Sequence, residues 1–417
     1  MLGKSYFHDL LKVANGSRTC PHYWEESIPL PHKFNLIVFT KSSTMTNPAD
    51  FSGLLPYVGP PDETQILSRL RTVAEQGVFR HSLPARFGGY GDDFAALVKT
   101  HRRLGEACRD PGLMLAVNAH LWGSVFPILL YGSEVQQETF LPPLLNGHWL
   151  GGHAITEPSC GSDVQAMTTI AEPSADGYVL NGEKRYITNV PLADWLVVYA
   201  KLDGRITAFL ISRDDDGCRF SHDGALQACR GSATGSVILK DCRLAADRLL
   251  GKIGAGTQMI QKALEYERAF VFAGIAGIME WQLAEVVRHS RERRSGGVHL
   301  GKHQAISHRI ADMKLRLDTV DLWLNECARL CDNGQRLTLA SAQTKLYAAE
   351  AFLQSSLDAV QIIGAAGLAS GSPMAGLVQD ALAGRLFSGS SEVQKNLIAA
   401  LLGTGDAYRA NPLSHQA

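Results

Sequence analysis

Three blocks with different hydrophobic periodicity follow one another along this chain of 417 residues. Residues 61–150 show mainly the three- and four-residue spacing of helices, whereas residues 151–250 contain several short β-rich runs, and residues 251–417 are helical again. The length suffices for about two or three domains with a large core. We therefore predict an α+β fold with an N-terminal helical domain, a small central β-barrel or sandwich and a C-terminal four-helix bundle.

The first helical block contains recognisable starts and stops. Residues 62–77 begin with acidic residues and end at a glycine, as expected of a helix. Residues 93–107 and 111–131 continue the helical pattern. Glycine and proline pairs at residues 87–89 and 141–143 predict loops.

Residues 1–60 are expected to be a poorly defined N-terminal extension. Residues 1–44 show no clear period and contain several prolines. Met45, which directly precedes Thr46-Asn47-Pro48, is an alternative start of the native protein. Mass spectrometry of natively expressed protein tests this hypothesis.

The central block is punctuated by turn residues. Residues 178–180 and 186–188 flank Asn181-Gly182, a dipeptide typical of two-residue hairpin turns, so a β-hairpin is predicted here. Short strands at this spacing favour a small barrel or sandwich. Further β-rich runs follow at residues 195–199, 206–211 and 236–239.

The C-terminal block contains the apolar seam of a long helix. Its residues alternate three and four positions apart, which is the pattern of core packing in a helical bundle. The seam consists of Ile310, Met313, Leu317, Val320, Leu324 and Cys327.

The eight cysteines contain no C-x-x-C pair. Cys327 and Cys331 are four apart on the same expected helix, but no histidine follows them with the spacing of a metal site. We interpret the cysteines as buried free thiols and predict no metal site. They are Cys20, Cys108, Cys160, Cys218, Cys229, Cys242, Cys327 and Cys331.

Charge and hydropathy exclude several classes of partner. The 40 basic and 41 acidic residues give a formal net charge of −1, which provides no general field for nucleic acid or an anionic membrane. No apolar run approaches the roughly 18–20 residues that span a bilayer, and the N-terminus lacks the order of a secretory signal. We therefore expect a cytoplasmic protein.

The most informative segment is 154–163, with the sequence AITEPSCGSD. It combines hydroxyls at Thr156 and Ser162 with acids at Glu157 and Asp163, in a loop marked by proline and glycine. Such a loop presents hydroxyls and backbone N–H groups to a polar, planar ligand, although an ordinary turn has the same composition.

The segment resembles the T-E-P-x-x-G-S-D signature of the acyl-CoA dehydrogenase family. Further matches follow in the family's order, and the resemblance covers roughly residues 60–403. It implies bound FAD and the α,β-dehydrogenation of an acyl thioester. The matching segments are NGEKRYITN at 181–189, KHQAISHRIADM at 302–313, DAVQIIG at 358–364 and FSGSSEVQ at 387–394.

The resemblance implies a role for several residues in binding FAD. Thr156 would bond the edge of the isoalloxazine, and Thr188 would bond its N5. Tyr186 occupies the position of a flavin-packing Trp, and Arg293 matches an arginine that pairs with FAD pyrophosphate across a subunit interface. The full set is Thr156, Ser162, Tyr186, Thr188, Arg293, Gln361, Gly364, Ser390 and Glu392.

One departure from the family lies beside Arg293. Many members carry a Phe-Gly pair after this arginine and its neighbour, whereas this chain has Ser295-Gly296-Gly297. The aromatic contact to FAD is therefore expected to be missing. Because the family completes its FAD site with a neighbouring subunit, the resemblance also implies a homodimer or homotetramer.

The reaction requires a base for the α-proton and polarisation of the thioester carbonyl. Many family members place a Glu directly before the Gly of the C-terminal loop, but Ser388 stands there in this chain. A minority branch, including isovaleryl-type dehydrogenases, uses an earlier helix, where Glu267 aligns. Glu265 faces another way and is a poor substitute. The alternative for Glu267 is a surface acid paired with Arg268 or a residue one turn on.

The resemblance also implies residues that bind the substrate. A carboxylate in a dry pocket is a suitable base, and the backbone N–H of Ser388 is a candidate donor to the thioester carbonyl. The substrate-binding candidates are Ser162, Arg268, Ser388 and Gly389.

The nature of the thioester is left open. Residues 191–201 and 384–394 are similar to a branch that oxidises acyl or aminoacyl groups on carrier proteins, including prolyl groups, but a small acyl-CoA fits equally well. A carrier protein is acidic, so a basic entrance is required, and Arg102, Arg103 and Arg109 are candidates. The electron acceptor is electron-transfer flavoprotein or O₂.

Two other function classes remain as alternatives. A flavin-dependent oxidase or monooxygenase on the same fold often uses an Asp base in the C-terminal loop, where Ser388 stands. A non-catalytic FAD-binding module would not need Glu267. The chain contains no G-x-S-x-G or H-E-x-x-H motif, which excludes the corresponding hydrolases.

Overall fold

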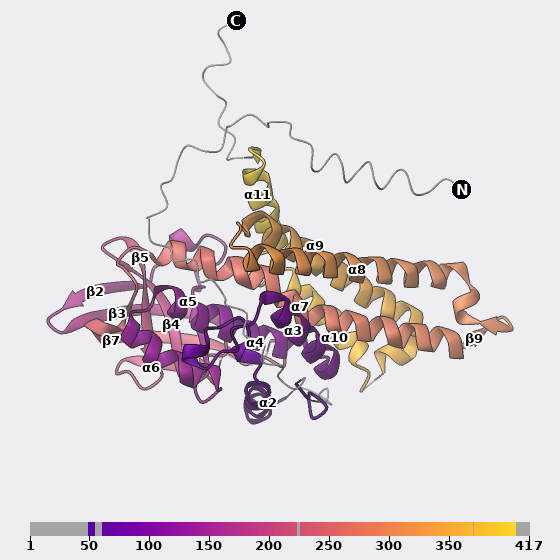
Figure 1. The fold of residues 1–417 in the computed structure, drawn as a ribbon, viewed down its shortest axis with the longest axis horizontal. Coiled ribbons are helices and arrows are strands. Elements are labelled where there is room, and N and C mark those ends of the chain that lie inside the picture. The colour runs from indigo at the N-terminus through magenta and orange to yellow at the C-terminus, as the bar shows by residue number, and fades with distance from the viewer. Residues whose placement is uncertain (1–48, 55–60, 223–225, 370, 406–417) are drawn as a thin grey trace, which may run out of the picture. The chain divides into compact units, whose positions relative to one another are not determined.

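The computed structural model describes residues 49–54, 61–222, 226–369 and 371–405 (Figure 1). The expected extension over residues 1–44 and the alternative start at Met45 lie outside these residues. Helices precede an eight-stranded sheet, and a second set of helices follows it, which confirms the predicted order of helical, β and helical blocks. The domain boundaries near residues 60, 150 and 250 remain a prediction.

The N-terminal helices begin where short polar side chains cap free backbone N–H groups. The Asp62 carboxylate accepts from the backbone N–H of Gln65, and Asp93 and Ser133 cap later helices in the same way. The helices are α2 (Glu63–Glu75), α3 (Phe94–Cys108), α4 (Pro111–His120), α5 (Phe126–Tyr131) and α6 (Glu134–Leu145).

The expected loop at residues 141–143 is wrong, because Pro142 and Pro143 lie inside α6. The apolar neighbours Leu141, Leu144 and Leu145 are buried in the main hydrophobic core. Their burial stabilises the last helical turn against the loss of backbone hydrogen bonds at the two prolines.

The stretch from 111 to 131 is helical, as predicted, but it contains one π-helical turn at Leu121–Val125. The cause is Pro127, which has no N–H to bond the carbonyl of Gly123 four residues earlier and whose ring crowds that carbonyl. The backbone N–H of Phe126 bonds Leu121 instead. The resulting bulge lies next to strand β1 (Gly151–Ala154).

The central sheet has the strand order β6-β7-β3-β2-β4-β5-β8, and β1 pairs with β4 in parallel. Its apolar side chains form a core separate from that of the helices, including Leu180, Val198 and Phe209. The remaining strands are β2 (Ile170–Ser174), β3 (Gly177–Thr188), β4 (Trp195–Leu202), β5 (Arg205–Ser212), β6 (Cys218–His222), β7 (Thr234–Ala245) and β8 (Leu249–Leu250).

The predicted hairpin at Asn181-Gly182 is wrong, because both residues lie within the single strand β3. The pairing of β3 with β7 shifts register between Leu180 and Gly182, so the dipeptide forms a β-bulge rather than a turn. A side chain at Gly182 would lie 2.5 Å from the Thr169 hydroxyl, which explains the glycine. The true hairpin joins β2 to β3.

The C-terminal helices pack against one another and against α3. Five of the six predicted seam residues on α8 are buried, and Ile310 is half-buried in a smaller cluster. The helices are α7 (Gly256–Glu292), α8 (Gln304–Asp332), α9 (Thr338–Ile363), α10 (Pro373–Gly384) and α11 (Ser391–Leu401).

Short elements connect these parts. A two-stranded hairpin, β9 (Arg294–Ser295) and β10 (Val298–His299), follows the end of α7 (Figure 1). Single 3₁₀ turns span Val78–Arg80, Ala85–Phe87, Val164–Ala166, Ala246–Arg248, Leu300–Lys302 and Gly364–Leu368.

Three helical stretches are long and apolar enough to cross a membrane, which corrects the expectation that no such run exists. They are Pro111–Tyr131, Gly256–Glu292 and Thr338–Leu368, with 89%, 67% and 44% of their apolar windows buried inside the protein. For the first two, packing in the core accounts for most of the apolar character.

The described cysteines are unbridged. Cys218 and Cys331 are half-buried and the others are buried, in keeping with the interpretation as free thiols. Cys20 lies outside the described residues. The Sγ of Cys327 lies 3.1 Å from the Thr344 hydroxyl in the bundle core.

Candidate active site

Glu267 and Ser388 meet although they are far apart in the sequence. Glu267 lies on α7, and Ser388 lies in the loop between α10 and α11. The Ser388 hydroxyl donates to Glu267 Oε1 at 2.7 Å, and the Glu267 residue is only 4% exposed. The alternative of a surface acid is therefore wrong, because the helix turns this carboxylate into the protein.

The loop that carries Ser388 is held in an unusual backbone conformation. Ser388 has φ +55° and Gly389 has φ +88°. The Ser388 carbonyl accepts from Arg268 Nε at 3.1 Å, and the Gly389 carbonyl accepts from Gln394 Nε2 at 2.9 Å. A positive φ at a serine carries strain, and these side-chain donors hold the loop in place. The loop ends at Ser390, whose hydroxyl caps α11.

Arg268 therefore contacts the loop through its guanidinium and lies beside Glu267 on α7. Burial lowers its pKa, while the neighbouring carboxylates of Glu267 and Glu265 act in the opposite direction. Glu265 itself bonds Lys262 at 2.7 Å and the Thr338 hydroxyl at 2.5 Å. It thus points away from Ser388, as the helical spacing predicts.

His153 is a residue of this site that sequence reasoning missed. Its Nε2 lies 3.6 Å from Glu267 Oε2. Within the described part of the chain, neither Glu267 Oε2 nor His153 Nδ1 has a hydrogen-bond partner, and both atoms are buried. Burial lowers the pKa of His153, while Glu267 acts to raise it. The available signal was a titratable side chain in an otherwise small and apolar strand, three residues before Thr156.

The π-turn of the helical stretch 111–131 positions His153. A Cβ at Gly123 would lie 2.8 Å from the backbone N of His153 and 3.0 Å from its Cγ. Only a glycine allows β1 and the imidazole to approach the helix this closely. The irregular turn imposed by Pro127 thus fixes the imidazole beside Glu267.

The polar residues of the loop at 154–163 are of two kinds. Glu157 is paired inside the protein, whereas the hydroxyls of Thr156 and Ser162 have no partner among the described residues. Glu157 is buried, bonds Lys184 Nζ at 2.7 Å and accepts from the backbone N–H of Thr169 at 3.0 Å. Burial acts to raise the pKa of Glu157, but the Lys184 contact and the other donors lower it to about 2. Among the described residues, the hydroxyls of Thr156 and Ser162 have no hydrogen-bond partner, so they are available to a ligand.

The end of β3 is distorted next to this loop. Tyr186 has φ +57°, and the register of β3 against β7 shifts between Lys184 and Ile187. Tyr186 is 56% exposed, and the Arg185 guanidinium lies 5.3 Å from the centre of its ring. Two residues on, the Thr188 hydroxyl makes no bond within the described chain. Bulges of this kind re-aim side chains at functional sites.

The chain matches three domain models in the order of its three blocks. The N-terminal, middle and C-terminal domains of acyl-CoA dehydrogenase match residues 54–148, 152–242 and 254–403. The chain belongs to the acyl-CoA dehydrogenase family. It is an FAD-dependent oxidoreductase that dehydrogenates acyl thioesters, as the sequence predicts.

Three relatives are informative. An L-prolyl peptidyl-carrier-protein dehydrogenase of Pseudomonas fluorescens is 35% identical over 331 residues, which cover 78% of this chain and 87% of the relative. The isovaleryl-CoA dehydrogenase of Bos taurus is 33% identical over 358 residues, covering 83% of both chains. The crystal structure of the prolyl acyl carrier protein oxidase AnaB has a TM-score of 0.79 at 34% identity and covers 81% of this chain and 90% of its own.

The free side chains of the acyl-CoA dehydrogenase fold suit FAD. The hydroxyls of Thr156 and Thr188, which have no partner among the described residues, are chemically suited to the polar edge of a flavin, and the exposed Tyr186 has a free aromatic face. The side chains of Arg293 and Gln361 are exposed and make no hydrogen bond within the described residues. The residues present therefore fit the cofactor that the family requires.

The expected FAD residues form two groups in the enzyme. Thr156, Tyr186 and Ser390 lie around the β sheet and the Ser388 loop. Arg293 directly follows the C-terminal end of α7, whereas Glu267 lies near the start of this helix. Gln361 and Gly364 lie at the end of α9, whose Ile362 packs with Val286 near the end of α7. Glu392 is exposed in the first turn of α11, and Ser162 is exposed in its loop.

The departure beside Arg293 has a clear structural form. Gly296 and Gly297 have φ values of +58° and +79°, and they connect β9 to β10. Two successive residues with positive φ are typical of a tight hairpin turn, which glycines adopt without strain. A short hairpin therefore occupies the position of the family's aromatic contact.

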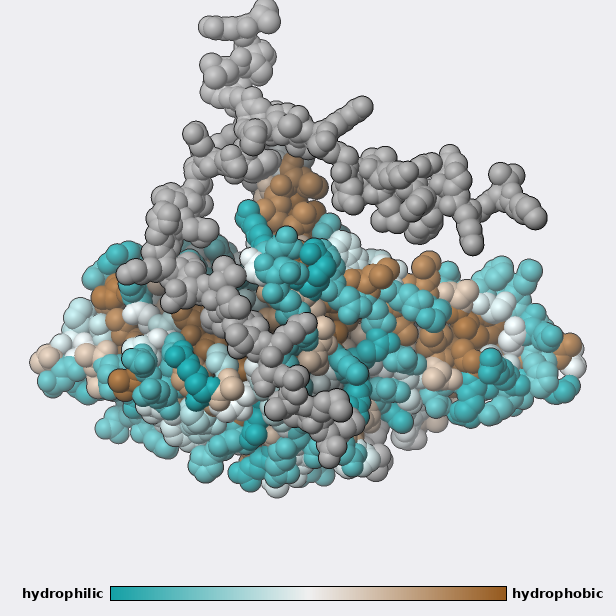
Figure 2. Space-filling model, viewed as in Figure 1, coloured by the Kyte–Doolittle hydropathy of each residue, from teal (hydrophilic) through white to brown (hydrophobic). Residues whose placement is uncertain are grey.

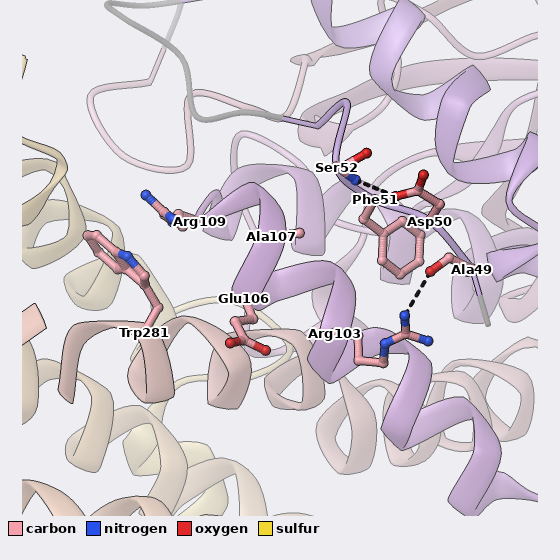
Figure 3. Close-up of a pocket in the computed structure, with 9 residues that line it drawn as sticks. All are labelled: Ala49, Asp50, Phe51, Ser52, Arg103, Glu106, Ala107, Arg109 and Trp281. Carbon is pink, nitrogen blue, oxygen red and sulfur yellow. Dashed lines mark hydrogen bonds between the residues drawn. The ribbon is translucent and has the colours of Figure 1, made fainter. Parts of the chain in front are cut away.

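The enzyme's three candidate arginines for a basic entrance are engaged elsewhere. Arg102 bonds Glu280 at 2.9 Å and also pairs with Asp321. Figure 3 shows Arg103 and Arg109 at a hollow of about 530 Å³ between residues 49–52, α3 and α7. Arg103 donates to the Ala49 carbonyl at 2.9 Å, and the Arg109 guanidinium stacks 4.6 Å from the Trp281 ring centre. Arg102 is thus paired with two carboxylates, whereas a basic entrance at Arg103 and Arg109, which pair with no carboxylate among the described residues, stays a prediction.

Proposed function

We propose that this enzyme dehydrogenates an α-aminoacyl group held as a thioester on a carrier protein, and that Glu267 is the base that removes the α-proton. The observation that carries the proposal is the condition of the Glu267 carboxylate. It is 4% exposed, bonded to Ser388 at Oε1 and unpaired at Oε2 within the described residues. A carboxylate kept from water with one free oxygen is suited to take a weakly acidic proton.

Ser388 supports this base and does not replace it, because its hydroxyl donates to Glu267. The backbone N–H groups of Ser388 and Gly389 make no hydrogen bond in the part of the chain that the structure describes. We propose that they bind the thioester carbonyl and stabilise the negative charge that develops there. Arg268 and Gln394 keep these two N–H groups in position by bonding the carbonyls of the same loop.

FAD, when bound, supplies the acceptor for the hydride that leaves the β-carbon. We propose that Thr156 and Thr188 bond the flavin ring and that Ser162 lies near the flavin or the thioester. Tyr186 is proposed to cover the ring face, since its exposed side chain sits beside Thr188 on the same distorted strand. Ser390 and Glu392 are proposed to contact FAD from the start of α11.

Arg293 is proposed to bind the FAD of a partner subunit. It lies 26 residues beyond Glu267, so the two are roughly 39 Å apart along α7 at about 1.5 Å per residue. An FAD whose flavin lies beside Glu267 does not place its pyrophosphate at that distance. Gln361 and Gly364 lie near the same end of the bundle and are proposed to contact the adenine half of the same partner-bound FAD.

This arrangement requires a homodimer or homotetramer, and the surface supports one. Figure 2 shows hydrophobic side chains gathered on α11 and over the part of the bundle that α8 and α9 form. Contiguous patches of exposed large apolar side chains are typical of an interface, and several such side chains here are at least 45% exposed. They include Leu315, Leu322, Leu357, Leu368, Leu386 and Leu402.

The carrier-bound aminoacyl substrate is supported by two relatives at 34–35% identity whose names specify prolyl groups on carrier proteins. A small acyl-CoA remains the alternative, since the isovaleryl-CoA dehydrogenase is 33% identical. We also propose that the enzyme acts in the cytoplasm, as the sequence predicts.

Anaerobic titration of the FAD-loaded enzyme with a thioester panel tests the proposal. The panel contains prolyl and other aminoacyl groups on a carrier protein, and short straight and branched acyl-CoAs. We expect bleaching of the flavin band near ~450 nm with the carrier-bound aminoacyl groups. Bleaching with acyl-CoAs alone would overturn the carrier assignment, and no bleaching with any thioester would overturn Glu267-dependent dehydrogenation.

The electron acceptor is the second unknown of the reaction. The relative AnaB is named an oxidase, which supports O₂, whereas electron-transfer flavoprotein is the alternative. Reduced enzyme is exposed to air or to electron-transfer flavoprotein, and the return of the flavin band is timed. Rapid recovery in air identifies O₂ as an acceptor.

A further inference from the structure

Two polar side chains lie side by side at the proposed base, and among the described residues Glu267 Oε2 and His153 Nδ1 have no hydrogen-bond partner. Glu267 Oε2 is 3.6 Å from His153 Nε2, and these side chains are only 6% and 14% exposed. A buried polar atom without a partner carries a free-energy penalty unless a ligand supplies the missing hydrogen bond. His153 is thus an unexplained polar group within the site, since removing the α-proton requires only Glu267.

From this geometry we propose that His153 accepts a hydrogen bond from the α-amino group of the substrate and so makes the enzyme specific for aminoacyl over acyl thioesters. The inference rests on the proposed function, because it assumes that Glu267 is the base. It assigns a substrate-recognition role to a residue that is not needed for the chemical step.

The spacing of the two acceptors fits an α-amino acid. The α-nitrogen and the α-hydrogen are bonded to the same carbon, so two acceptors a few ångströms apart can face both at once. With Oε2 directed at the α-hydrogen, Nε2 lies beside the nitrogen. The close approach of Gly123 to His153 limits the movement of the imidazole toward the helix.

The charge distribution also favours this role. Burial lowers the pKa of His153, while Glu267 acts to raise it, and a neutral ring accepts at Nε2 when its proton is on Nδ1. A neutral amine that donates its N–H to Nε2 leaves Oε2 free for the C–H proton.

The same arrangement rejects a substrate without nitrogen. A methylene in place of the amine leaves the imidazole without a partner and adds an apolar group next to a carboxylate. Sites built to bond an N–H group discriminate strongly against analogues that lack it. Straight and branched acyl groups therefore gain nothing from His153.

The test compares two thioesters that differ in one atom. Prolyl-pantetheine and cyclopentanecarbonyl-pantetheine have the same ring, with NH in one and CH₂ in the other. The full-length, FAD-loaded enzyme is compared with His153→Phe, which keeps a ring but removes the acceptor, and with His153→Gln, which keeps an acceptor. His148→Gln removes an exposed histidine elsewhere and is the matched control.

Two readouts are used for each variant. The first is the anaerobic rate of flavin reduction, and the second is the dissociation constant of each thioester, measured by calorimetry in a Glu267→Gln background that does not turn over. For His153→Phe we expect the prolyl preference to fall at least about tenfold in both readouts. His153→Gln should keep part of the preference, and His148→Gln should keep all of it.

The outcomes separate the inference from the proposed function. An unchanged prolyl preference in folded, FAD-loaded His153→Phe overturns the role of His153 and leaves Glu267 untouched. If His153→Phe does not fold, an unchanged preference in His153→Asn, whose shorter side chain withdraws the acceptor, overturns it equally. Failure of the wild-type enzyme to be reduced by either thioester overturns the proposed function itself.

Discussion

The Ser388 hydroxyl donates a 2.7 Å hydrogen bond to the carboxylate of Glu267, although the two residues are 121 positions apart. This contact joins the two places in which the family is expected to carry its base. The serine occupies one position and holds the carboxylate that extends from the other. The loop and the helix are therefore joined at the proposed base.

Glu267→Gln should retain FAD but lose flavin reduction by about 10²–10⁴-fold, because an amide does not accept the α-proton. Stopped-flow absorbance under anaerobic conditions measures the rate. The control is Glu265→Gln, which removes a neighbouring carboxylate that bonds Lys262 and Thr338 instead. Equal rates in wild type and Glu267→Gln would remove Glu267 from the mechanism.

Gly389→Ala should lower the free energy of unfolding by about 1–3 kcal/mol, because a side chain is strained at its φ of +88°. The added Cβ would also lie 2.8 Å from Gln394 Nε2, which helps to hold the loop. Urea denaturation measures the effect, and Gly376→Ala, where a Cβ has open space, is the control. Equal losses for both variants contradict this account of the loop.

The acid stability of the protein should depend on buried histidines. Burial, aided by the nearby His81, lowers the pKa of His101 to about 3. Burial also lowers the pKa of His120 to about 4, although its bond to the Leu144 carbonyl acts to raise it. The unfolded chain therefore binds more protons, so stability is fully present above about pH 6.5 and is lost as the pH falls.

The contribution of His101 between pH 7 and pH 5 should be about 2 kcal/mol. Replacing this residue, as in His101→Phe, should remove that part of the pH dependence. Urea denaturation of wild type and variant at both pH values measures the difference. An acid sensitivity that is the same in both proteins would falsify the assignment to His101.

Arg102→Met should destabilise the fold by about 1–3 kcal/mol without weakening the binding of a carrier protein. The guanidinium joins α3 to Glu280 on α7 and Asp321 on α8, and its loss leaves two carboxylates without their partner. Thermal denaturation and the KM for the carrier-bound substrate are measured together. An increased KM with unchanged stability would instead indicate that Arg102 helps to bind the carrier protein.

Arg293→Ala should weaken FAD binding by about tenfold or more, because a charge-assisted contact to pyrophosphate is lost. Arg294→Ala is the matched control, since the neighbouring guanidinium bonds the Gly297 carbonyl within its own hairpin. FAD release on dilution is followed by flavin fluorescence. A mixed oligomer of Arg293→Ala and Glu267→Gln subunits tests whether Arg293 binds the FAD of the partner. In such an oligomer, the site that keeps Glu267 receives Arg293 from the other subunit, so partial activity should return.

Local sequence signals anticipated much of the fold. Helix starts at Asp62 and Asp93 and the apolar seam of α8 follow from capping and periodicity, which act over a few residues. The segment at 154–163 pointed to the family, and the complementary pattern at Glu267 and Ser388 predicted Glu267 as the base. These features could be predicted because each depends on residues close together in the sequence or on a recognised motif.

Local signals failed where packing outweighs propensity. Asn181-Gly182 has the composition of a hairpin turn, but pairing with β7 over the whole of β3 turns it into a bulge. Pro142 and Pro143 have the composition of a loop, but burial of their apolar neighbours keeps α6 helical. In both cases long-range contacts contribute more free energy than the local preference does.

The chain's order of residues thus specified the type of each block and the family motif, and it predicted Glu267 as the base. Only the folded chain brings His153 to within 3.6 Å of Glu267, and only there does Arg102 meet Glu280 and Asp321. The physical reason is that these contacts join elements far apart in sequence. Their formation depends on how a π-turn, a sheet and a helical bundle pack together, which no local pattern encodes.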